Sequence, residues 1–99
     1  MMMVIRVLVT VQADKVAAFV AHMQQECVEV KEKFAGCERF DLFADPEKGE
    51  RFLIYEEWET AEHFDAYRNS GYFQENGQVL FPMLAGAPDS AYFEAKRVF

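Results

Sequence analysis

Two stretches of eight residues, Cys37–Ala44 and Arg51–Trp58, flank a short turn, and this pattern constrains the fold more than any other part of the sequence. Apolar and polar side chains alternate along both stretches, as they do in β-strands. The turn, Asp45–Gly49, contains Pro46, which presets one backbone dihedral, and ends in Gly49, which tolerates positive φ. The pattern therefore predicts an antiparallel hairpin.

Large apolar side chains occupy both faces of this hairpin. One parity holds Phe40, Leu42, Phe52 and Ile54, and the other holds Phe43, Leu53 and Tyr55. A face of an antiparallel sheet that meets water should be polar. The composition points the same way, because 52% of the 99 residues are hydrophobic, more than one small core requires. A second copy of the same sheet is the simplest cover, so we expect a homodimer.

The segment before the hairpin predicts a strand followed by a long helix. Val4–Val11 is an almost unbroken β-branched run, which suits a strand largely buried on both faces. Apolar residues then recur at helical spacing over Val16–Phe34, with Asp14 as the expected N-cap. Gly36 suits the left-handed position that ends a helix.

The segment after the hairpin predicts a second helix, a short helical insert and a last strand. Thr60 is the expected N-cap of a helix over Ala61–Arg68. Tyr72–Ala85 favours a short helix, because Pro82 prevents a long regular one. Ser90–Val98 has the pattern of a strand. The order predicts one α+β domain over residues 1–99, a ferredoxin-like β-α-β-β-α-β sandwich with helices on one sheet face.

Charge and motif content exclude several functional classes. The formal net charge of −7 argues against nucleic acid as a partner, since phosphate binding needs a basic surface. The sequence contains no segment of membrane-spanning length, no secretion signal and no nucleotide-binding fingerprint, so we expect a cytoplasmic protein without membrane contact. Cys27 and Cys37 lack the spacing of a redox or zinc motif and are expected to be reduced, buried side chains. His22 and His63 are the only histidines; both are assigned to the surface, and no metal site or cofactor is expected.

Strand parity suggests a candidate site in the hairpin. Asp41 and Tyr55 lie on one face of neighbouring strands, together with Arg39. If that face looks toward the helices, these side chains meet in one cavity, where a carboxylate and a phenol could abstract or relay a proton. The alternative is structural: an Arg39–Glu57 cross-strand pair and a tyrosine hydroxyl bonded to a carboxylate.

Three further aromatic residues have two interpretations. Trp58, Tyr67 and Tyr72 could line a slot for a flat substrate, or they could be core and rim residues. For Trp58 the core or the dimer interface is favoured.

Five motifs together resemble one known family. They are Gly36-Cys37-x-x-Phe40-Asp41, Asp45-Pro46, Ile54-Tyr55-Glu56-x-Trp58-x-Thr60, Phe64-Asp65-x-Tyr67 and Ser70-Gly71-Tyr72-Phe73. Over nearly the whole chain they resemble the antibiotic-biosynthesis-monooxygenase-type domain. The resemblance implies a dimeric α/β barrel with a ligand cavity between helices and sheet in each subunit. Members include cofactor-free oxygenases of anthrones and quinols, haem-degrading enzymes, and an isomerase of a phosphorylated autoinducer.

At several positions the sequence differs from individual subgroups of the family, and these differences reduce the number of activities that the resemblance implies. Haem-degrading members carry a catalytic Asn, Trp and His, whereas here the first strand has no Asn, Tyr67 replaces the Trp, and no His follows Phe73. Asp41 and Tyr55 match polar pocket positions of the isomerase subgroup. Cys27 and Glu59, however, stand near the places of that subgroup's His and Lys.

The sequence thus predicts a cofactor-independent monooxygenase that abstracts a proton from an aromatic, quinol-type or small carbonyl substrate. Asp41 and Tyr55 are the predicted catalytic residues. The predicted substrate-binding residues are Arg39, Trp58, Tyr67 and Tyr72. Two alternatives stay open: an isomerase of a small phosphorylated carbonyl compound, and a non-catalytic ligand-binding, stress-related dimer.

Overall fold

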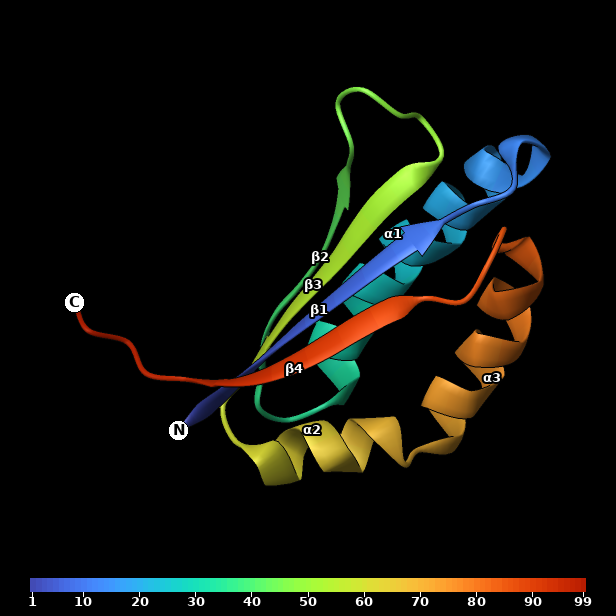
Figure 1. The fold of residues 1–99 in the computed structure, drawn as a ribbon. Coiled ribbons are helices and arrows are strands. Elements are labelled where there is room, and N and C mark those ends of the chain that lie inside the picture. Colours follow the sequence, from blue (N-terminus) through green and yellow to red (C-terminus); the bar gives the residue numbers. More distant parts are fainter.

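A computed structural model describes residues 1–99 as a four-stranded antiparallel sheet with helices packed against it (Figure 1). The elements are β1 (Met2–Thr10), η1 (Ala13–Lys15), α1 (Val16–Lys33), β2 (Cys37–Ala44), β3 (Arg51–Trp58), α2 (Ala61–Arg68), α3 (Gly71–Leu80), η2 (Phe81–Met83) and β4 (Asp89–Ala95). The strand order across the sheet is β2-β3-β1-β4, with every neighbouring pair antiparallel. This confirms the predicted α+β, ferredoxin-like β-α-β-β-α-β fold, with α3 and η2 inserted before the last strand.

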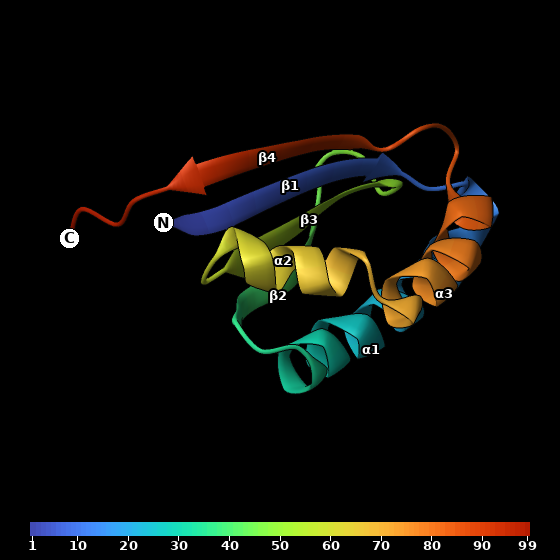
Figure 2. The ribbon, with the colours of Figure 1, turned by 90° about the horizontal axis from the view of Figure 1, so that it is seen from below.

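All three α-helices lie on the same side of the sheet, and the other side is uncovered (Figure 2). None of the helices combines the length and the apolar character that spanning a membrane requires. The fold therefore has one closed face, between sheet and helices, and one open face.

The core fills the closed face. On β3 the even-numbered residues Phe52, Ile54 and Trp58 are buried, and on β1 the odd-numbered Ile5 and Val9 are buried. Because side chains alternate along a strand, the intervening residues point to the open face. Parity thus assigns the hairpin residues from Arg39 onward to one face or the other, while Cys37, before a register shift, packs on the core.

The predicted hairpin is confirmed, with both strands at their expected bounds. Its turn is stabilised by Asp45, whose Oδ1 accepts hydrogen bonds from the backbone N–H groups of Glu47 (2.8 Å) and Lys48 (3.3 Å). A register irregularity between Cys37 and Arg39 marks the start of β2.

The start of α1 differs from the prediction. Asp14 lies within η1, and no side chain caps the N-terminus of α1. The chain enters the helix through this 3-10 turn, in which the N–H of Lys15 donates to the carbonyl of Gln12 at 2.9 Å. Asp14 is therefore not an N-cap.

The residue after α1 requires glycine, as expected. Gly36 has φ of +83°, and a Cβ there would lie 2.3 Å from Cγ of His63. Any other residue would combine a left-handed backbone with a steric clash.

The remaining elements follow the prediction, with differences of a few residues at their ends. Thr60 caps α2 by accepting from the N–H of His63 at 3.2 Å, and Pro82 falls in η2, beyond the end of α3. The last strand ends at Ala95 instead of Val98, because β1 starts at Met2, the partner of Ala95, and offers nothing further to pair with.

Candidate active site

A cavity of about 140 Å³ lies between the helices and the sheet. Of its 19 lining residues, 13 are hydrophobic. They come from the sheet, for example Ile5, Val7 and Ile54, and from α3, for example Phe73 and Leu80. An apolar cavity with a few polar groups is the usual form of a small-molecule site.

Two carboxylates, Glu26 and Glu56, are the charged groups of this cavity wall, and they are only 4% and 5% exposed. Sequence analysis missed both, although the pattern contains the signal. Glu26 falls in the apolar stripe of α1 between Met23 and Val30, and Glu56 falls on the buried parity of β3, next to Trp58. A carboxylate in an apolar stripe or on a core-facing parity calls for a functional explanation, because burying an unpaired charge is costly.

Glu56 accepts one hydrogen bond from the protein. The indole Nε1–H of Trp58 donates to its Oε1 at 2.9 Å. Burial raises the pKa of the Glu56 carboxyl to about 7; the Trp58 hydrogen bond opposes the rise, and the charge of Glu26 adds to it. Near neutral pH this group exchanges a proton readily, as a general base must.

The Glu26 carboxyl accepts no side-chain hydrogen bond from the protein, and its oxygens are not fully enclosed, because the only enclosed side-chain polar atom without a partner is the Tyr72 hydroxyl. Burial raises the pKa of its carboxyl to about 7 as well, with a smaller contribution from the charge of Glu29. The cavity therefore holds two carboxyl groups that titrate in the neutral range, one of them free of protein partners.

Tyr67 lies in the cavity wall, 3% exposed, and stacks on Trp58 with ring centroids 5.1 Å apart. Burial, followed by the charges of Glu26 and Glu56, raises the pKa of its hydroxyl well above the usual range. The hydroxyl thus stays protonated and can donate a hydrogen bond. Trp58 itself is fully buried behind the cavity, so its core interpretation is the one the structure supports.

Tyr72 lies outside the cavity wall. Its ring packs against Phe34 at 5.6 Å between centroids and beneath the ammonium of Lys33 at 5.0 Å. Its hydroxyl is enclosed without a hydrogen-bond partner, and burial raises its pKa to about 12. Tyr72 thus lies just behind the cavity wall: its carbonyl accepts a hydrogen bond from the side chain of Asn76, which lines the cavity, at 2.9 Å.

Asp41, Tyr55 and Arg39 share the parity of the open face, and Asp41 and Arg39 also line a hollow at the edge of β2 with Gln24 and Cys27 of α1. Asp41 and Tyr55 are register partners across β2 and β3, as their shared parity suggests, but neither lines the cavity. Their expected position in the helix-side cavity is wrong, because the helices cover the opposite parity, that of Glu56 and Trp58. Whether they move a proton stays a prediction, which now concerns the open face.

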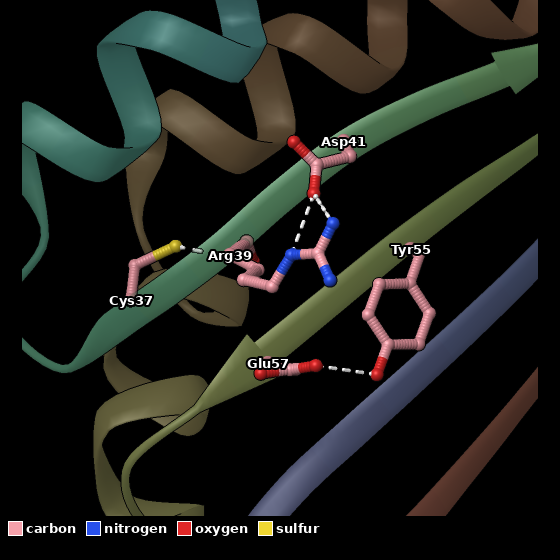
Figure 3. A network of polar contacts seen from close by, with 5 residues as sticks. All are labelled: Cys37, Arg39, Asp41, Tyr55 and Glu57. Carbon is pink, nitrogen blue, oxygen red and sulfur yellow. Dashed lines mark hydrogen bonds and ion pairs between the residues drawn. The ribbon is translucent and has the colours of Figure 1, made fainter.

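Each of these side chains has its own partner in Figure 3. Arg39 donates from Nε and Nη2 to Oδ2 of Asp41 at 2.9 and 2.8 Å, while the Tyr55 hydroxyl donates to Oε2 of Glu57 at 2.6 Å. The tyrosine–carboxylate bond of the structural alternative is confirmed. Arg39 and Glu57 are register partners across the two strands, as that alternative holds, but the ion pair of Arg39 is with Asp41 on its own strand.

The two histidines are not surface residues. His22 is half-buried, and its Nε2 lies 2.6 Å from Oδ1 of Asn76 on α3, which also lines the cavity. His63 is half-buried beneath Gly36, with Nδ1 2.8 Å from the Thr60 hydroxyl. Both surface assignments are wrong, since α3 covers the first residue and the turn after α1 covers the second.

The other candidate groups do not form a reactive site. Cys27 and Cys37 are free and half-buried, and burial raises the pKa values of their thiols to about 11 and 12, so both stay protonated. No group of three or more His, Cys, Asp or Glu side chains is arranged to hold a metal ion.

Several solved structures have this fold. The structure is similar to a candidate antibiotic biosynthesis monooxygenase from Caulobacter crescentus, with a TM-score of 0.91 and 23% identity over 97% of this chain and 91% of that one. A second such protein, from Nitrosomonas europaea, has a TM-score of 0.86 and 20% identity over 95% and 89%. A conserved protein from Methanosarcina mazei has a TM-score of 0.86 and 21% identity over 96% and 93%. These likenesses establish the fold.

The sequence itself establishes the family. No curated protein matches the chain. The family model described as antibiotic biosynthesis monooxygenase matches residues 2–76, which include the predicted hairpin, both cavity carboxylates and Tyr67. The chain therefore belongs to the antibiotic biosynthesis monooxygenase family.

Proposed function

We propose that this protein is a cofactor-independent monooxygenase that removes a proton from a small, electron-rich aromatic substrate of the quinol type. The reaction takes place in the cavity between helices and sheet, with Glu56 as the base. The observation that carries the proposal is a carboxyl group, 5% exposed in an apolar cavity, whose pKa is raised to about 7. Family membership supports the oxygenase class.

The chemistry needs little from the protein beyond proton transfer and orientation. Glu56 takes a hydroxyl proton from the quinol, and the electron-rich ring carbon then gives electrons to dioxygen and forms a peroxide anion. Protonated Glu56 returns its proton to the peroxide, and loss of water leaves a hydroxyquinone. One oxygen atom stays in the product and the other leaves as water, while the substrate supplies all the electrons. A base with a pKa near the working pH suits such reversible transfer.

The supporting residues hold this base in place. The Trp58 N–H fixes one oxygen of Glu56, so the other oxygen is free to face a substrate. The Tyr67 hydroxyl, protonated and close enough to sense both carboxylate charges, can donate to an oxygen of the substrate. Apolar walls keep water from the reacting groups.

The alternative reaction, isomerisation of a phosphorylated compound, lacks support from the cavity. Its lining includes no Lys or Arg, whereas proteins bind phosphate chiefly through such cations or through helix N-termini. The proposed monooxygenase reaction needs no cationic side chain, because its substrate has no phosphate group.

The proposal includes a homodimer that covers the open face. Apolar side chains there include the half-exposed Phe43 and Phe93, at 46% and 51%, and the partly buried Leu8 and Leu53. Exposed apolar groups gathered on one sheet face are typical of a subunit interface.

Oxygen uptake tests the function. Purified protein with hydroquinone should consume dioxygen, and with ¹⁸O₂ one labelled atom should appear in the hydroxyquinone. Replacing Glu56 with Gln, which can still accept the Trp58 hydrogen bond, should lower kcat by roughly 10²–10⁴-fold. Glu57→Gln, on the next residue and the other face, is the matched control. Full activity of Glu56→Gln would remove Glu56 from the mechanism, and no uptake with any bound quinol would reject the oxygenase.

A further inference from the structure

The carboxylate end of the cavity is built from two elements that approach each other across the core. Glu26 comes from α1 and Glu56 from β3, and both line the cavity. Tyr67 lies in the same lining, and the pKa shifts agree with this placement, since the charge of Glu26 acts on Glu56 and both charges act on the hydroxyl of Tyr67. All three groups therefore point toward one end of the same space.

This end has more hydrogen-bond acceptors than the protein satisfies. A carboxylate offers about four acceptor positions. Glu56 uses one of them for Trp58, and Glu26 uses none. The only enclosed side-chain polar atom without a partner is the Tyr72 hydroxyl, so the free oxygens of the two carboxyl groups are open to the cavity, where a ligand can donate to them.

The rest of the lining offers an anion no compensation. It includes no Lys, Arg or His. His22 lies outside the lining and contacts Asn76. An anionic ligand in this cavity would lie beside two carboxylates in a medium that screens charge poorly. The net charge of the chain, −7, adds to the repulsion of an anion.

The size of the cavity limits the ligand further. Its volume is about 140 Å³. A protein cavity of roughly 150 Å³ is known to accommodate one benzene molecule. A single ring with small substituents fits, and a second fused ring would require the walls to move.

We infer that Glu26, acting together with Glu56, is a specificity-determining residue that admits neutral single-ring ligands donating two hydrogen bonds and excludes anions. The inference rests on the proposed function in that it takes this cavity as the substrate site. It goes beyond that function by giving Glu26, which the proposed reaction does not use, the role of selecting the ligand.

Calorimetric titration without oxygen tests this inference, because binding is then measured in the absence of turnover. The probes are hydroquinone, 2,5-dihydroxybenzoate, which adds a carboxylate to the same ring, and 1,4-dimethoxybenzene, which lacks both donors. Hydroquinone should bind, and each of the other two should bind roughly tenfold more weakly or worse. Naphthalene-1,4-diol, with a second ring, should also bind more weakly than hydroquinone.

Two variants test whether Glu26 causes the preference for the neutral ligand. Glu26→Gln should reduce the preference for hydroquinone over 2,5-dihydroxybenzoate by on the order of tenfold. Glu32→Gln, on the exposed side of the same helix, should leave the preference unchanged. Equal binding of the anion and hydroquinone by the wild type, or no hydroquinone binding, would overturn the inference.

The two proposals fail in different ways. Selective hydroquinone binding without oxygen uptake would reject the monooxygenase and keep the selectivity of the carboxylate pair. Oxygen uptake with equal binding of hydroquinone and 2,5-dihydroxybenzoate would keep the monooxygenase and reject the selectivity of the carboxylate pair.

Discussion

Glu56 and Glu57 are neighbours on β3, yet they lie on opposite faces of one sheet and in opposite surroundings. Glu56 faces the helices, is 5% exposed, and has its pKa raised to about 7 by burial. Glu57 is half-buried on the open face and accepts a hydrogen bond from Tyr55 at 2.6 Å. A step of one residue thus separates a carboxyl group suited to proton transfer from one in a structural pair. Burial decides the role, and residue type does not.

The largest effect is expected from placing a charge on the closed face. Ile54 is 8% exposed and faces the helices, so Ile54→Asp would bury an unpaired carboxylate and lose apolar packing, at a cost of about 3–5 kcal/mol. Leu53→Asp, on the open face, should keep the fold and convert the homodimer to a monomer. Thermal melts followed by circular dichroism and sedimentation velocity measure the two effects. A monomeric wild type would reject the homodimer, and a stable, dimeric Ile54→Asp variant would contradict the assignment of faces.

An intermediate effect is expected on the pH dependence of stability. The folded protein holds the Glu56 proton with a pKa of about 7, against 4.5 for an unperturbed carboxyl. Because the folded state binds this proton more tightly, Glu56 costs no stability below about pH 4.5, and the cost grows as pH rises toward 7. At pH 8 it should reach on the order of 3 kcal/mol.

Glu56→Gln should therefore be more stable than the wild type at pH 8 and nearly equal to it at pH 5. Urea denaturation at the two pH values measures this difference. Glu57→Gln is the control for the other face and should change stability by less than about 1 kcal/mol at either pH. If Glu56→Gln gains nothing at pH 8, burial does not raise the pKa of the Glu56 carboxyl.

The smallest effect is expected from Asp41→Asn and Tyr55→Phe on the open face. The Arg39–Asp41 pair is partly exposed, so its loss should cost less than about 1 kcal/mol. Oxygen uptake by both variants should stay within about twofold of the wild type, since the two residues lie outside the cavity. A fall of about 100-fold in each, with a double mutant that loses less than the product, would instead place proton transfer at Asp41 and Tyr55.

Sequence alone predicted the elements well where local chemistry decides them. The hairpin bounds follow from side-chain alternation and from the turn at Asp45, and the end of α1 follows from Gly36. The order of these elements predicted the fold class, and the family motifs agreed with it. These features depend on neighbours in the chain, which a sequence displays directly.

The candidate site was harder to predict, because it depends on which face of the sheet the helices cover. Alternation separates Tyr55 from Glu56 but does not say which of them is buried. The apolar residues on both parities of the hairpin removed the usual clue. Glu26 was overlooked because the helix was predicted from its apolar residues alone. The charged residue that falls among those apolar residues was the most informative position of the helix.

The hydrogen bond from Trp58 to Glu56 has a practical consequence. Trp58 is the only tryptophan in the chain, it is fully buried, and its indole N–H ends on the carboxyl group assigned as the base. The tryptophan fluorescence of the protein thus comes from one indole. The carboxyl group bonded to that indole, Glu56, is the group proposed to gain and lose the proton in the reaction. Fluorescence titration of the unmodified protein should follow the ionisation of Glu56 without a label, and quenching by an added quinol should follow the filling of the cavity in the same cuvette.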